Sequence, residues 1–107
     1  MDTDTLSLFP LTSAVNVAGH LQVGGCDVSA LVDRFGTPLY VFDEATLRSR
    51  CRSFVRAFSS RHPRSRVHYA GKAYLGLRLA QLVRDEGLGL DVVSLGEMHM
   101  AQQAGFP

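Results

Sequence analysis

Residues 66–82 read RVHYAGKAYLGLRLAQL, and this stretch decides how the chain is expected to fold. An apolar run over residues 67–70 predicts a buried strand, which ends where Gly71 and Lys72 begin. Residues 75–86 follow, with apolar side chains at helical spacing. The stretch therefore predicts a strand, a short connection that carries a lysine, and a helix.

The next residues repeat the same order of elements. Gly87 is placed to end the first helix, and residues 88–94, LGLDVVS, predict a second strand that is mostly apolar on both faces. Residues 95–105 predict a further helix that Gly105 ends. Strand, helix, strand and helix with short connections predict an α/β fold with a parallel sheet. Because two strands cannot form a stable parallel sheet alone, the chain either recruits strands from elsewhere or is the front piece of a larger protein, and we expect the second.

The N-terminal third shows weaker signals. The first dozen residues look loosely structured, and residues 21–23 predict a short strand that ends in a turn at Gly24 and Gly25. Asp27 can cap a short helix that Gly36 closes.

A second helix is expected after a proline-containing connection. Residues 37–42, TPLYVF, are expected to be extended, because Thr37 precedes a proline. Asp43 then starts a helix with arginines largely opposite an apolar stripe. The stripe consists of Leu47, Cys51, Phe54, Val55 and Phe58.

Composition limits the functional classes. The chain has 107 residues, 46% of them hydrophobic and 20% charged, with a formal net charge of +1. These values are typical of a globular protein and do not suggest a nucleic-acid or membrane partner. The arginines that cluster between residues 48 and 66 are interpreted as a solvated helix face and a loop.

The cysteines and histidines argue against a secreted or metal-binding protein. Cys26 and Cys51 are two unclustered thiols without a secretory signal, so a reducing cytoplasm is expected. The four histidines show no metal-ligand spacing, and no metal is predicted.

Lys72 is the residue with the clearest chemical signal. It is the only lysine beside ten arginines, and it follows a predicted parallel strand, where functional groups of α/β folds gather. Lysine, unlike arginine, has an amine that can deprotonate and form a Schiff base. A surface ion and a Schiff-base lysine both remain open from the residues alone.

Two acidic residues near the second strand share this ambiguity. Asp91 lies inside an apolar strand, where a carboxylate needs a partner, and it could pair with Lys72 as a structural ion pair or act in a site. Glu97 lies three residues after Ser94, which is the spacing of a capping box. Glu97 could therefore cap the helix, act in the site, or both.

Several motifs together resemble the N-terminal part of the diaminopimelate decarboxylase family. They are GHLQVGGCDV, GTPLYVFDEATLRSRCRSF, VHYAGKAYL and EGLGLDVVSLGEMHMAQQAGFP, in family order between residues 16 and 107. The resemblance implies the N-terminal part of a truncated (β/α)8 TIM-like barrel, the alanine racemase-like fold type III of pyridoxal-phosphate enzymes. Residues 1–36 would be a lead-in that packs with a missing C-terminal β domain. Residues 37–107 would begin the cofactor-binding barrel with its first two β/α units.

The resemblance also implies a site. The lysine of the family's YAxKA motif, here Lys72, holds pyridoxal 5'-phosphate as an internal aldimine and is the catalytic residue. Asp91 and Glu97 match acidic positions near the cofactor. Tyr74 and Leu95 depart from the pattern, and Leu95 replaces a glycine whose loss could shift the loop.

The implied reaction is amino-acid decarboxylation. Meso-diaminopimelate would yield L-lysine and carbon dioxide in a cytoplasmic homodimer, whereas the 107 residues alone are expected to be inactive. A sibling decarboxylase acting on ornithine, arginine, carboxynorspermidine or a carrier-bound amino acid is the first alternative. A degenerate, non-enzymatic barrel piece that binds a partner through its open sheet edge is the second.

Overall fold

The computed structural model describes residues 3–107 and divides into two compact units, Met1–Leu47 and Arg48–Pro107. Helix α3, Glu44–Ser59, begins in the first unit and continues in the second. The predicted division into a lead-in, residues 1–36, and a barrel start, residues 37–107, stays a prediction. Residues 1 and 2 of that lead-in lie outside the described residues.

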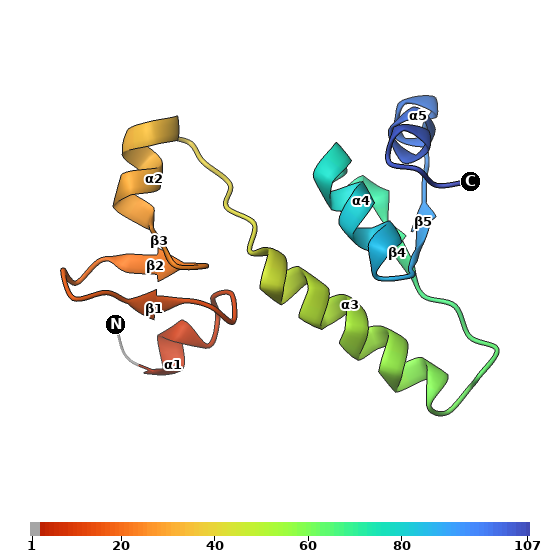
Figure 1. Cartoon of the computed structure of the whole chain (residues 1–107), viewed down its shortest axis with the longest axis horizontal. Coiled ribbons are helices and arrows are strands. Elements are labelled where there is room, and N and C mark those ends of the chain that lie inside the picture. The colour runs from red at the N-terminus through yellow and green to blue at the C-terminus, as the bar shows by residue number, and fades with distance from the viewer. Residues whose placement is uncertain (1–2) are drawn as a thin grey trace. The chain divides into compact units, whose positions relative to one another are not determined.

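The first unit contains a three-stranded antiparallel sheet of order β1-β2-β3 (Figure 1). The predicted strand is confirmed as β2, and Gly24 and Gly25 form the two-residue turn to β3 with φ of +58° and +79°. The chain start, expected to be loosely structured, contains one helical turn instead. The elements in chain order are α1 (Thr3–Leu6), β1 (Ala14–Val15), β2 (Leu21–Val23), β3 (Cys26–Asp27) and α2 (Val28–Phe35).

The predicted caps of α2 are confirmed. The Asp27 carboxylate accepts hydrogen bonds from the backbone N–H groups of Ser29 and Ala30, at 2.8 and 3.4 Å. Its second oxygen lies 2.9 Å from Nδ1 of His20, and this contact, ahead of the other hydrogen bonds, lowers the pKa of Asp27 to about 2. Gly36, with a φ of +78°, ends the helix.

The connection at residues 37–43 forms no strand, and the Thr37–Pro38 peptide is cis. Asp43 begins α3 as predicted, because its carboxylate accepts hydrogen bonds from the backbone N–H and the hydroxyl of Thr46. The Thr46 hydroxyl is the main cause of a lowered pKa for Asp43.

The second unit contains two β/α repeats. Strands β4 and β5 pair in parallel, with His68, Tyr69 and Ala70 opposite Gly89, Leu90 and Asp91. This pairing confirms the expected parallel α/β arrangement. The elements after α3 are β4 (His68–Ala70), the 3-10 turn η1 (Gly71–Ala73), α4 (Leu77–Asp85), β5 (Gly89–Asp91) and α5 (Leu95–Gln103).

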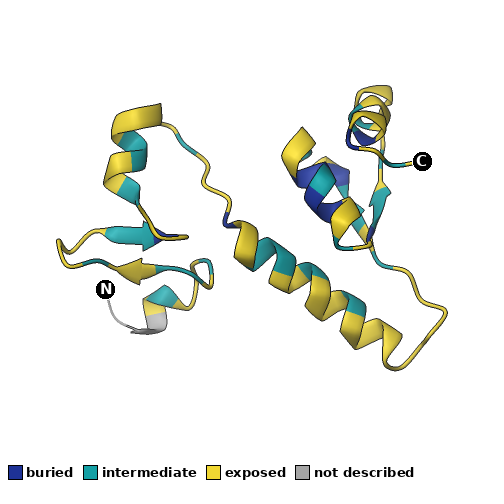
Figure 2. Cartoon of the chain, in the orientation of Figure 1, coloured by how far each residue is buried: buried dark blue, intermediate teal, exposed yellow. Residues whose placement is uncertain are grey.

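Helix α4 supplies most of the core of this unit. Figure 2 shows buried residues gathered on α4. The helical spacing predicts Leu75, Leu79, Leu82 and Val83 as its inward positions; the last three are buried, whereas Leu75 precedes the helix and is half-buried. The helix begins two residues later than predicted, because Gly76 keeps an extended backbone at its N-cap. Arg84 reaches the carbonyl oxygen of Ala104 and so ties the C-terminus of α5 to α4.

The arginines of α3 are not all solvated, which corrects the sequence interpretation. Arg48 and Arg52 lie one helical turn apart and both bind Glu86, whose side chain is only 7% exposed. The three hydrogen bonds measure 2.7–2.9 Å and lower the pKa of Glu86 to about 2, the contact with Arg52 being the larger cause. The apolar stripe of α3 is partly covered: Leu47, Cys51 and Val55 are half-buried, whereas Phe54 and Phe58 are 56% and 51% exposed.

Gly71 allows η1 to lie against β5. A Cβ atom built on this buried glycine would lie 2.9 Å from the carbonyl oxygen of Asp91 and 3.8 Å from Cδ of Glu97. Real Cβ atoms essentially never come that close to a backbone oxygen. The glycine is therefore required by the close approach of two segments.

We expect Gly71→Ala to lower the free energy of unfolding by about 1–3 kcal/mol, because the added methyl group forces η1 away from β5. Urea unfolding followed by circular dichroism measures the change. Gly96→Ala is the matched control, since its Cβ would meet no atom closer than 3.8 Å and it lies in α5. Equal stability of the two variants would contradict the close approach at Gly71.

Glu86 should make the stability of the second unit depend on acid. Since its pKa falls from 4.5 to about 2 on folding, its contribution is present above pH 4.5 and is lost as pH falls from about 4.5 to about 2. Glu86→Gln should therefore be less stable than the natural protein at pH 6, and this difference should disappear near pH 2. Asp27 also has a lowered pKa, so the measured quantity is the difference between the two proteins in urea unfolding at each pH.

Asp85→Asn is the control for Glu86→Gln. Asp85 precedes Glu86 and, among residues 3–107, forms its ion pair with its exposed neighbour Arg84, at 2.7 Å with side chains 39% and 41% exposed. The stability difference between Glu86→Gln and the natural protein is the quantity to follow. If it stays constant from pH 6 to pH 2, the ion pairs of Glu86 do not stabilise the fold.

Candidate active site at the strand ends

The parallel register brings the carboxyl ends of β4 and β5 to one edge of the sheet (Figure 1). Ala70 and Asp91 are the last residues of their strands and lie opposite each other. Lys72 follows two residues after Ala70, in η1, and its side chain is exposed. The predicted position of the lysine at a strand's carboxyl end is therefore observed.

Asp91 lies beside the turn that carries the lysine. Its backbone carbonyl faces Gly71, the residue before Lys72, and its side chain is exposed at the strand end. Within residues 3–107, no ion pair joins Asp91 to Lys72, so the structural pair weighed from the sequence is not formed here. Both charged groups therefore face solvent.

Glu97 has a structural role that differs in detail from a capping box. Ser94 caps α5 as predicted, because its hydroxyl accepts the backbone N–H of Glu97 at 3.1 Å. The Glu97 carboxylate accepts the N–H of Val93 at 2.6 Å, one residue before the cap. The same carboxyl group lies next to the Cβ position of Gly71. Glu97 thus links the end of β5, the start of α5 and the lysine turn.

The two departures from the family pattern cause no strain. Leu95 is the first residue of α5 and is 84% exposed, and no described residue other than glycine has a positive φ. Leu95 therefore does not adopt the positive φ that a glycine would allow. Tyr74 is extended, with a φ of −174°, and its hydroxyl lies 2.7 Å from the Cβ position of Gly76. The glycine leaves room for the tyrosine ring.

One interaction at the site has no signal in the sequence pattern. The hydroxyl of Tyr69 donates a hydrogen bond to the backbone carbonyl oxygen of Tyr74 at 2.8 Å. The bond spans η1 and therefore encloses Lys72 between its two ends. A tyrosine in an apolar strand predicts only packing, so sequence reasoning missed this contact.

These residues offer chemistry that fits an aldehyde cofactor. Lys72 supplies an exposed primary amine, and Asp91 and Glu97 supply carboxylates on the neighbouring strand end and helix start. An amine can condense with an aldehyde, and carboxylates can bind the protonated amine or orient it. Among residues 3–107, no group of three or more His, Cys, Asp and Glu could hold a metal ion.

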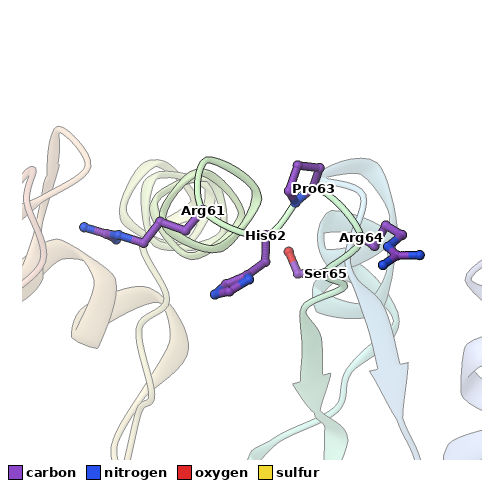
Figure 3. Close-up of a pocket in the computed structure, with 5 residues that line it drawn as sticks. All are labelled: Arg61, His62, Pro63, Arg64 and Ser65. Atoms are coloured by element: carbon purple, nitrogen blue, oxygen red, sulfur yellow. The ribbon is translucent and has the colours of Figure 1, made fainter.

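A basic hollow elsewhere in the second unit is not part of this site. It has a volume of about 540 Å³, is lined by residues 61–65, and precedes β4 rather than following it. Figure 3 shows Arg61 and Arg64 pointing away from each other, so their charges do not converge on one point.

In the part of the chain described, no helix is long and apolar enough to cross a membrane.

Comparisons with known proteins identify the family of the chain. Residues 44–107 match the family described as "Pyridoxal-dependent decarboxylase, pyridoxal binding domain". Diaminopimelate decarboxylase of Bacillus subtilis (strain 168) is 49% identical over 96 residues, which cover 90% of this chain and 22% of that protein. The enzyme of the same name from Synechocystis sp. is 46% identical over 93 residues, covering 86% of this chain and 20% of that protein.

A solved structure shows the same fold. The crystal structure of AQ1208 from Aquifex aeolicus matches with a TM-score of 0.75 and 32% identity, covering 90% of this chain and 23% of that one. The chain thus spans about a fifth of the length of the curated relatives that it matches. The expected fold class and the expected cofactor, pyridoxal phosphate, are confirmed at the level of the family. The chain belongs to the pyridoxal-binding domain family of the pyridoxal-dependent decarboxylases.

Proposed function

We propose that this chain is the N-terminal part of a pyridoxal-phosphate-dependent decarboxylase that converts meso-diaminopimelate to L-lysine and carbon dioxide. The observation that carries the proposal is the single lysine of the chain at the carboxyl end of a parallel strand, in a domain of this family. Relatives that are 39–49% identical, including those of Bacillus subtilis and Mycobacterium bovis, carry the name diaminopimelate decarboxylase, which supports this substrate.

Lys72 is the catalytic residue in this proposal. Its Nζ is the amine that would hold the cofactor, by condensing with the cofactor aldehyde and releasing water. When bound, the cofactor supplies an electron sink for the electrons released as the α-carboxylate leaves. An arginine could supply the same charge at this position, but its guanidinium does not deprotonate and cannot take this role.

Asp91, at the end of β5, and Glu97, in the first turn of α5, are proposed to bind the cofactor. The Asp91 carboxylate, exposed at the same sheet edge, stabilises the protonated amine of Lys72 when that amine is released. Glu97 keeps the end of β5 and the start of α5 in place through the N–H of Val93. The two acids therefore have different roles, one electrostatic and one largely architectural.

The wider assignment includes partners and location. The proposed enzyme is a cytoplasmic homodimer that acts on a small amino acid, and residues 37–107 would supply only the first two β/α units of its barrel. A sibling decarboxylase for ornithine or arginine is the competing function, because the family match covers the cofactor-binding domain in general.

The first test maps the cofactor lysine in the full-length protein. The protein is incubated with pyridoxal phosphate and then treated with borohydride. The amine condenses with the aldehyde, which forms a C=N bond and releases water. Hydride from borohydride then reduces this bond to a stable secondary amine. Mass spectrometry should find saturable modification at Lys72 and little at the N-terminal amine. Lys72→Arg keeps the charge and should lose the adduct, with decarboxylation falling on the order of 10⁴-fold or more. Absence of the adduct from the natural full-length protein would refute the assignment.

The second test measures substrate choice. Carbon dioxide release from meso-diaminopimelate, ornithine and arginine is compared as kcat/KM with the same full-length protein. A site built to bind the second carboxylate of diaminopimelate should favour it by roughly 10⁴-fold over ornithine, which lacks that group. A preference for ornithine or arginine would replace diaminopimelate by the sibling substrate and leave the cofactor assignment intact.

A further inference from the structure

The turn that carries Lys72 is short and weak by itself. The 3-10 turn η1 has three residues, and 3-10 turns have poorer hydrogen-bond geometry than α-helices. Its N-cap residue is Ala70, whose side chain cannot accept a hydrogen bond from the turn. Contacts from outside the turn must therefore fix its conformation.

Two such contacts hold the turn from different sides. On the side of β5, Gly71 lies against the carbonyl oxygen of Asp91. The second contact is the hydrogen bond from the hydroxyl of Tyr69 to the carbonyl oxygen of Tyr74, at 2.8 Å. The residues before and after η1 are thereby joined, with Lys72 between them.

The environment of Tyr69 keeps its hydroxyl a hydrogen-bond donor. Tyr69 lies opposite Leu90 in the parallel pair, and Ala70 lies opposite Asp91. Because successive side chains of a strand point to opposite faces, Tyr69 and Ala70 lie on different faces of the sheet. The ring is half-buried, and burial is the main cause of a raised pKa for its hydroxyl. The hydroxyl therefore keeps its proton at neutral pH and remains a donor.

We propose that Tyr69 is a positioning residue for Lys72: its bond to the Tyr74 carbonyl fixes the turn so that the amine is presented at the strand end before the cofactor arrives. This inference rests on the proposed function of Lys72. Its physical basis is preorganisation, because a turn held in one conformation loses less freedom when its lysine reacts.

The test compares Tyr69→Phe with the natural full-length protein. Phenylalanine keeps the ring and removes the hydroxyl, so packing is retained and only the bond to Tyr74 is lost. The measured quantity is the rate of borohydride-trapped pyridoxal-phosphate attachment at Lys72, relative to the N-terminal amine of the same molecule. We expect Tyr69→Phe to react about 3- to 10-fold more slowly, the scale of one neutral hydrogen bond. Tyr40→Phe, the same change at a residue 88% exposed in the other unit, should react like the natural protein.

Thermal melting separates positioning from simple stabilisation. If Tyr69→Phe melts at a lower temperature but its folded form reacts at Lys72 at the natural rate, Tyr69 is only structural and the proposal is overturned, while the function of Lys72 stands. If the natural protein itself forms no adduct at Lys72, the proposed function fails and the positioning role fails with it. The two failures are thus distinguished by the natural protein alone.

A second measurement needs no variant and applies if Tyr69→Phe does not fold. Hydrogen exchange of the natural apoprotein reads the backbone amides of residues 71–75 before any cofactor is added. A preformed turn should exchange at least about 10-fold more slowly than an unstructured peptide of the same sequence. Exchange at the peptide rate, with protection appearing only after pyridoxal phosphate is added, would overturn the proposal.

Discussion

The parallel register of β4 and β5 is the constraint on which the second unit depends. Pairing Ala70 with Asp91 puts both strand ends at one edge, and it brings the turn after β4 against the last residue of β5. A shift by one residue would exchange the two faces of the sheet and move Asp91 away from the lysine turn. Gly71 fixes this arrangement further, since any larger side chain would collide with the Asp91 carbonyl. The position of Lys72 therefore follows from strand pairing rather than from its own contacts.

The second determinant is electrostatic and acts on the helices. Glu86 lies at the C-cap of α4, where the helix dipole disfavours a negative charge. Two guanidinium groups from α3 compensate for this position, and the nearly complete burial of the Glu86 side chain keeps water from screening them. Arg48 and Arg52 thus attach a helix that has no fully buried residue of its own. These ion pairs therefore hold α3 against the end of α4, where the partly exposed apolar stripe of α3 buries little surface.

Local signals in the sequence predicted most of the elements but few of the contacts between them. Asp27, the Gly24-Gly25 turn and Gly87 act through neighbouring backbone, so their residue types were sufficient. The partners of Glu86 and the bond from Tyr69 to Tyr74 depend on side chains that meet only after folding. The position of Lys72 could be predicted because parallel strands place their ends together. The position of its amine relative to Asp91 could not, since it depends on how closely Gly71 approaches β5.

Arginine and lysine have different roles in this chain. Where a positive charge serves the fold, arginine is present: Arg52 binds both carboxylate oxygens of Glu86 through two nitrogens, a planar geometry that a lysine could not reproduce, and Arg48 adds a third bond. Lys72 makes no ion pair with any residue between 3 and 107, and its side chain is exposed after the carboxyl end of β4, the edge at which β5 also ends. A lysine that contributed only charge could have been an arginine, as at the other ten basic positions. Its separation from the ion pairs that stabilise the fold leaves the amine available for reaction, and this is what a covalent cofactor site requires.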